Sequence, residues 1–207
     1  MSKIEIGFEW TRAGRYEIAA APTDKKLQVI RQIGRGRENY RPLEIDLANL
    51  HLRFAELADD DATVAFANAW GLLQTEARQG AMESLDSWRR EIRKMRGILS
   101  VLGAKTTEPG GFLRRGGDSL RLTKIDVLLR GGPGTRPTLL LKPPDLLSAM
   151  WLQLANSIAS GSSIRECAEC GNWFHTGIGE KVRRSVAIFC SEKCKNQHHY
   201  KQRKARP

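Results

Sequence analysis

Cysteine is absent from the first 166 residues of this 207-residue chain, and all four cysteines fall between positions 167 and 194. A disulfide framework spreads its cysteines over the fold that it cross-links, so this distribution argues against one. Long apolar runs are also missing, because the longest uncharged stretch, residues 146–164, is interrupted by Ser, Gln, Asn and Gly. The N-terminus has no apolar segment of the kind that a secretory signal needs. We therefore expect a cytoplasmic protein without a membrane span.

The short motifs of common enzyme classes are absent as well. The sequence contains no Gly-x-Ser-x-Gly, no Walker loop and no His-Glu-x-x-His. His198 and His199 lie in a basic stretch without a neighbouring acid in the sequence, so they offer no obvious open metal site. The sequence predicts that the protein is not an enzyme.

What the chain does contain is typical of a globular protein, with 41% hydrophobic and 28% charged residues. We predict an α+β fold with two parts: a mainly helical N-terminal domain with short β-hairpins over residues 1–160, and a small zinc module over 161–207. The expected elements are a hairpin over 4–18 that turns at Ala13-Gly14, helices over 43–57, from Asp59 to Leu73, over 82–102 and after Asp145, and strands over 119–129 and 138–141.

The helix predicted over residues 82–102 has the clearest periodicity. Its apolar residues recur at steps of three and four: Met82, Leu85, Trp88, Ile92, Met95, Leu99 and Leu102. A stripe of this length packs either in the core of its own chain or against a second copy, as in a coiled coil. Core packing is the default, and a homodimer through 82–102 is the alternative.

Two short polar motifs have both a ligand-binding and a structural interpretation. Gly34-Arg-Gly-Arg37 could cradle a phosphate, but no clear strand precedes it, which favours a solvated basic loop. Asp59-Asp60-Asp61 could bind a metal, but adjacent acids at the start of a helix are typical of capping.

The four cysteines form the strongest motif. Their spacing is Cys167-x2-Cys170, nineteen residues, then Cys190-x3-Cys194, which is close to the pattern of a structural zinc site. Gly171 after the first pair suits a tight zinc knuckle, and Ser191 is placed to cap a helix that carries Cys194. A knuckle, a hairpin and a helix sharing one metal make a treble clef. Four thiolates leave no open coordination position, so we predict one structural Zn²⁺; four buried, reduced cysteines are the alternative.

Positive charge is concentrated around these cysteines. The chain has a formal charge of +11, and residues 165–207 hold 10 Lys plus Arg against 4 Glu. Aromatic residues are interspersed among them, which favours nucleic-acid binding, to DNA or RNA. The candidate contacts are Arg183, Arg184, Lys195, Lys201, Arg203 and Lys204. The alternatives are a solvated basic helix, or an adaptor whose zinc finger binds a protein partner.

The second cysteine pair also carries a family resemblance. The run Phe189-Cys-Ser-x-x-Cys194-Lys-Asn-Gln197, followed by His, Tyr and basic residues, resembles the CGNR zinc-finger family. Cys194 and Asn196 agree with the namesake motif, whereas Lys195 and Gln197 replace its Gly and Arg. The resemblance implies a bacterial cytoplasmic transcription regulator that binds DNA.

Overall fold

The computed structural model describes residues 4–45, 49–74, 82–103, 125–130, 138–160, 162–177 and 186–204. Their helices and antiparallel strands confirm an α+β fold. The elements in chain order are β1 (Ile4–Ile6), β2 (Trp10–Ala20), β3 (Gln28–Tyr40), α1 (Pro42–Ile45), α2 (Leu50–Ala55), α3 (Asp60–Trp70), β4 (Met82–Ser84), α5 (Leu85–Gly103), β5 (Asp126–Arg130), β6 (Thr138–Lys142), α7 (Leu146–Ala159), β7 (Ser163–Glu166), β8 (Trp173–Thr176) and α8 (Glu192–Lys204).

The N-terminal hairpin is much longer than the sequence predicts. β2 continues from Trp10 to Ala20 and pairs antiparallel with β3, so the turn lies over residues 21–27 and the prediction of a turn at Ala13-Gly14 is wrong. The pairing register shifts between Ala13 and Arg15, where the single residue Gly14 faces three residues of β3, 34–36. The extra residues of this bulge therefore lie in β3, where Gly34 has a φ of 78°, and β2 continues past Gly14. The prediction of a basic loop over 34–37 is therefore also wrong.

The predicted helix over 43–57 is two shorter helices, α1 and α2, and residues 46–48 lie outside the described part. α3 begins as predicted, because the Asp59 carboxylate accepts a hydrogen bond from the Ala62 N–H at 2.8 Å. Asp60 forms an ion pair with Arg89 at 2.7 Å, so these acids serve the fold. Asp145 caps α7 in the same way, as predicted.

Helix α5 lies at the centre of the main core. Its apolar stripe is buried, and the Trp88 ring packs against the rings of Phe54 and Phe66. The stripe therefore packs in the core of its own chain, as predicted by default, and this packing gives no support to the alternative of a homodimer through residues 82–102. β4 precedes α5 and pairs with β3, which joins the long hairpin to the helices.

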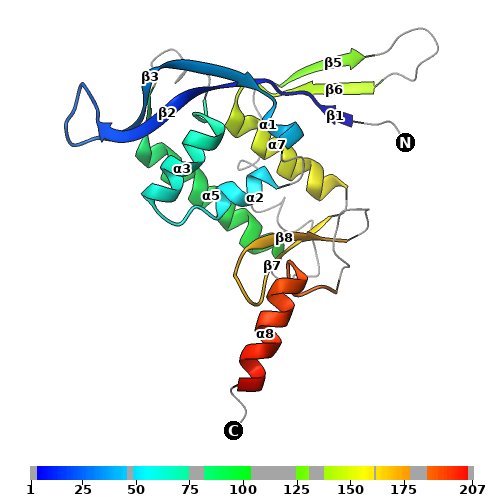
Figure 1. Ribbon diagram of the computed structural model, residues 1–207. Helices are drawn as coiled ribbons and strands as arrows, with labels where there is room; N and C mark the ends of the chain where they lie inside the picture. Colours follow the sequence, from blue (N-terminus) through cyan, green and yellow to red (C-terminus); the bar gives the residue numbers. More distant parts are fainter. Residues whose placement is uncertain are drawn as a thin grey trace.

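A second sheet has the order β1-β6-β5 and lies beside the long hairpin (Figure 1). β6 pairs parallel with β1 and antiparallel with β5. The prediction of strands over 119–129 and 138–141 is confirmed for β5 and β6, and residues 119–124 lie outside the described residues.

The C-terminal hairpin, β7 and β8, packs on the main body. Ile164 is only 2% exposed and belongs to the same apolar core as α5, and Trp173 packs against that core. The Trp173 N–H donates to the Glu56 carboxylate at 2.7 Å. A Cβ atom on Gly103 would lie 2.8 Å from the Trp173 ring, so this contact requires glycine at the end of α5.

A buried histidine, His51, and a partly buried one, His175, lie at the same junction. The rings of His51 in α2 and His175 in β8 have centroids 5.4 Å apart, and His51 Nδ1 lies 2.8 Å from Gln153 Oε1 in α7. The predicted boundary near residue 160 therefore lies in a region where both parts of the chain share buried contacts.

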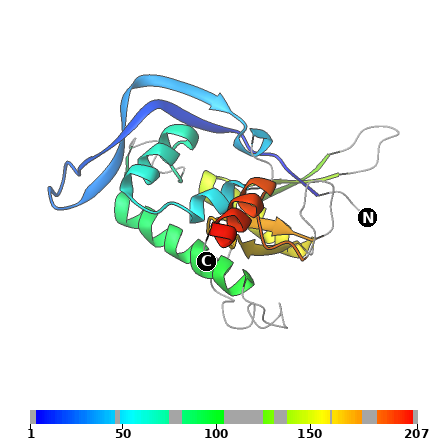
Figure 2. The ribbon, with the colours of Figure 1, turned by 60° about the horizontal axis from the view of Figure 1, so that its bottom comes forward.

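Helix α8 extends away from the rest of the chain (Figure 1), and it comes toward the viewer in Figure 2. None of its residues is buried. No helix among the described residues is both long enough and apolar enough to cross a membrane.

Candidate metal centre

The four cysteine sulfurs lie together between the C-terminal hairpin and α8. All four are free thiols, and their Sγ atoms lie within 4.8 Å of one another. The Sγ atom of Cys190 is 3.7 Å from that of Cys170 and 3.5 Å from that of Cys194. A tetrahedral zinc site with Zn–S bonds of about 2.3 Å has S–S edges of about 3.8 Å, so the residues fit one tetrahedral ion. They are the only such group among the described residues.

A tight turn between β7 and β8 positions the first cysteine pair. The Cys167 N–H donates to the Asn172 carbonyl, and the Cys167 carbonyl accepts from the Gly171 N–H, each at 2.9 Å. Gly171 has a φ of 74°, in the left-handed region that glycine adopts without strain. The tight turn that the knuckle prediction requires is therefore present between Cys167 and Gly171.

The start of α8 positions the second pair. Ser191 precedes the helix, and its Oγ accepts from the Cys194 N–H at 3.2 Å, as a capping residue does. The Ala168 N–H donates to the Ile188 carbonyl at 3.0 Å, which joins the knuckle to the segment before Cys190. Residues 178–185, which connect the two pairs and include the rest of the predicted treble clef, lie outside the described part.

The electrostatics of the cluster favour a bound cation. Burial raises the pKa of the Cys167 thiol, but donation by the N–H groups of Cys170, Cys190 and Glu169 outweighs it and lowers that pKa to about 6. For Cys190, burial and then the neighbouring sulfurs raise the pKa well above its usual value. Four adjacent thiolates repel one another, so a metal cation supplies the charge that lets all four ionise.

Glu169, between the two cysteines of the knuckle, is a site residue that the sequence analysis did not single out. Its side chain is 6% exposed and forms an ion pair with Lys201, while its other oxygen lies 3.3 Å from His198 Nδ1. The hydrogen bond from Lys201 is the main reason why the pKa of Glu169 is lowered. His198 therefore has an acidic partner that is distant in sequence. The Phe189 ring also packs against the His198 ring, with 5.1 Å between the ring centroids.

The predicted nucleic-acid contacts have different surroundings. Lys195 forms an ion pair with Glu192 at 3.5 Å, and Lys201 is paired with Glu169. The Lys204 ammonium lies over the Tyr200 ring, 5.0 Å from its centroid, and Arg203 is exposed without an acidic partner among the described residues. Arg183 and Arg184 lie outside the described residues.

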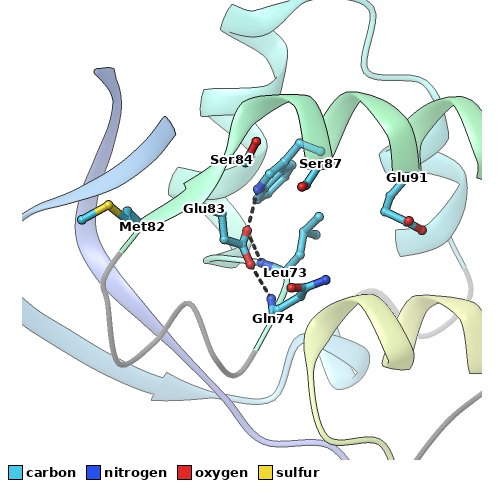
Figure 3. Close-up of a pocket in the computed structure, with 8 residues that line it drawn as sticks. Leu73, Gln74, Met82, Glu83, Ser84, Ser87 and Glu91 are labelled. Atoms are coloured by element: carbon cyan, nitrogen blue, oxygen red, sulfur yellow. Dashed lines mark hydrogen bonds between the residues drawn. The ribbon is translucent and has the colours of Figure 1, made fainter. Parts of the chain in front are cut away.

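A second candidate site is a cavity of about 270 Å³ beside the start of α5 (Figure 3). Burial raises the pKa of Glu83 in its wall to about 7, against the opposing effect of its hydrogen bonds. Its oxygens accept from the Leu73 N–H at 2.9 Å, the Gln74 N–H at 2.6 Å and the Trp88 indole. Both oxygens are therefore occupied by the chain itself, and we assign Glu83 a structural role.

No family model, curated protein or solved structure matches this chain. These comparisons therefore give no support to a CGNR family assignment.

Proposed function

We propose that this chain is a zinc-dependent nucleic-acid-binding protein, in which the metal holds α8 in place and α8 contacts the nucleic acid. The observation that carries the proposal is the state of α8: thirteen residues, none buried, with five Lys or Arg and one acid. A helix that is polar on all sides gains little from tertiary packing, and an isolated helix of this length is marginal in water. An exposed basic helix fixed at its base is suited to a polyanionic partner.

The ion pairs leave part of the positive charge of α8 available to a partner, because Lys193 and Arg203 have no acidic partner among the described residues. In and beside the long hairpin, Arg12, Arg31 and Arg41 are each within 3.0 Å of a glutamate oxygen. Three other exposed cations of the hairpin, Arg15, Lys25 and Lys26, have no ion pair in the described part of the chain. Both regions therefore carry positive charge that attracts phosphate, and we favour α8 because it is an exposed helix that starts at the proposed metal centre.

The proposed metal is a single structural Zn²⁺ bound by Cys167, Cys170, Cys190 and Cys194 in a treble clef. When bound, it supplies cross-links between the knuckle and the first turn of α8. Four thiolate ligands leave no position for a water nucleophile, so we assign the metal no catalytic role. A role in transcription regulation follows only from the family resemblance, and we propose it on that basis.

The test is fluorescence anisotropy of the zinc-loaded chain with duplex DNA and single-stranded RNA over a range of salt concentrations. The variant replaces Lys193, Arg203 and Lys204 with Gln, and the matched control replaces Arg15, Lys25 and Lys26, which are exposed on the long hairpin at the other end of the molecule (Figure 1). Binding should weaken in the α8 variant, and the log–log salt slope should fall by up to about 3. Equal weakening in both variants would contradict the assignment to α8.

A protein-binding adaptor is the second candidate, and one observation favours it. Val186 and Ile188, beside the base of α8, are 78% and 53% exposed, and they line a groove with Ala187 and Phe189. Exposed apolar side chains of this kind are typical of protein interfaces. If the zinc-loaded chain binds neither nucleic acid, the adaptor function becomes the better proposal.

A further inference from the structure

Helix α8 is attached to the metal centre through one face. Cys194 provides the metal ligand, and His198 and Lys201 contact Glu169 of the knuckle. These three residues are spaced by four and three positions, so they share one side of the helix. Contacts in the first turn and again one to two turns later fix the direction of the helix axis as well as its rotation. The opposite face is consequently held outward.

The outward face carries polar side chains suited to reading base edges. At about 100° per residue, Arg203 and Asn196 lie about 180–200° from Cys194 around the helix, and His199 and Tyr200 lie on either side of them. All four are exposed. Arg binds guanine O6 and N7 with two hydrogen bonds, and Asn binds adenine N6 and N7 in the same way. The seven residue steps from Asn196 to Arg203 give a rise of about 10 Å, which matches about three base-pair steps.

Lysines border this face on both sides. Lys195 lies about 100° from Cys194 in one direction, and Lys193 and Lys204 lie about 80–100° from it in the other. A helix in a groove has base edges in front of it and a phosphate backbone on each side. The outward side chains of α8 would therefore face the base edges, and the lysines on both sides would face the phosphates. Glu192 also lies on the outward side, in the first turn, where it is paired with Lys195.

The dimensions of the helix select the type of nucleic acid. A helix is about 10–12 Å wide with its side chains, and the major groove of B-form DNA is about 12 Å wide. The major groove of A-form RNA is too narrow for side chains to read. The centroid of the Phe189 ring lies 6.2 Å from that of His199, but no residue of α8 is buried, so the described part of the chain leaves the outward side open to a groove.

We propose that α8 enters the major groove of B-form DNA, with Asn196, His199, Tyr200 and Arg203 toward the base edges and Lys193, Lys195 and Lys204 toward the phosphates. Glu169 is a positioning residue that determines which face of α8 is presented. This inference rests on the proposed function and specifies its partner as duplex DNA.

The test uses the full-length, zinc-loaded chain to select a preferred site from a random-centre duplex DNA library. Binding is then measured to that site, to the same sequence as duplex RNA, and to its single strands. We expect the DNA duplex to bind at least tenfold more tightly than either. Replacing guanine with 7-deazaguanine in the selected site should weaken binding, because it removes a major-groove acceptor.

Variants of adjacent residues separate the outward face from the rest of α8. Asn196→Ala and Arg203→Ala should each relax the preference at one base pair by roughly tenfold. Gln197→Ala, an amide on a different side of the helix, should leave the preference unchanged, and Lys204→Ala should weaken binding to all sequences equally. Zinc content and far-UV circular dichroism confirm that each variant is folded.

Two sets of results would overturn the inference. Equal binding to duplex RNA or single strands, or equal effects of Asn196→Ala and Gln197→Ala, would contradict the placement of α8 in the major groove. The proposal of nucleic-acid binding itself would still stand. Absence of binding to every nucleic acid by the zinc-loaded chain would remove the proposed function as well.

Discussion

At the scale of single residues, the thiolate ligands offer the most direct test of the metal centre. Cys170→Ser removes one of four sulfurs, so zinc should be lost and α8 should lose its attachment. We expect a zinc-to-protein ratio near zero and a decrease in far-UV signal limited to the C-terminal helix. Ser191→Ala is the matched control, since it removes a helix cap at a cost of about 1 kcal/mol but no ligand. Retention of stoichiometric zinc by the Cys170→Ser protein would argue against a four-thiolate site.

The buried histidine at the junction predicts a dependence of stability on pH. Burial lowers the pKa of His51 from 6.5 to about 3, against a smaller opposing effect of its hydrogen bond with Gln153. Between these pH values the unfolded chain binds a proton at His51 that the folded chain excludes. The contribution of neutral His51 to the free energy of unfolding is therefore fully present above about pH 6.5 and is lost as the pH decreases.

The expected decrease in the free energy of unfolding due to His51 is at most about 1.4 kcal/mol per pH unit. Urea unfolding at pH 7, 6 and 5 measures this decrease. A His51→Gln variant should show a smaller decrease than the natural sequence, whereas His199→Ala, an exposed histidine on α8, should leave the decrease unchanged. Equal pH dependence in all three proteins would show that His51 is not responsible.

At the scale of elements, α5 contains two glycines that should respond in opposite ways to the same substitution. Gly97→Ala places a Cβ in open space on an exposed helical position, and it should stabilise the protein by about 0.5–1 kcal/mol. Gly103→Ala should destabilise it by about 1–3 kcal/mol, because the new Cβ would lie 2.8 Å from the Trp173 ring. Thermal unfolding of both variants measures the difference. A stabilising Gly103→Ala would show that Trp173 does not pack closely against α5.

The elements also show what local sequence can and cannot predict. The caps at Asp59, Asp145 and Ser191 and the apolar stripe of α5 follow from residues within a few positions of one another, and the structure confirms them. The cysteine cluster followed from spacing alone. The continuation of β2 through Gly14 was not predictable, because a glycine in a strand pattern indicates a turn equally well. Glu169 was missed because its partners, His198 and Lys201, come from a helix about 30 residues away.

At the scale of the whole molecule, the shared core predicts that metal binding and global stability are linked. β7 and β8 contribute Ile164 and Trp173 to the core around α5, and the turn between these strands carries Cys167 and Cys170, two of the four proposed metal ligands. Removing zinc with a chelator should therefore lower the midpoint of the main thermal transition, in addition to unfolding α8. Differential scanning calorimetry with and without chelator measures this. An unchanged main transition beside a separate small one would indicate two independent domains.

The position of α8 at one end of the molecule also has a kinetic consequence. α8 extends its positive charge into solvent beyond the rest of the chain (Figure 1). A polyanion that approaches this end of the molecule therefore meets α8 before it meets any other element. Electrostatic attraction at this point raises the association rate, and its effect declines steeply with ionic strength. The projecting helix thus extends the distance over which this end of the molecule captures a partner.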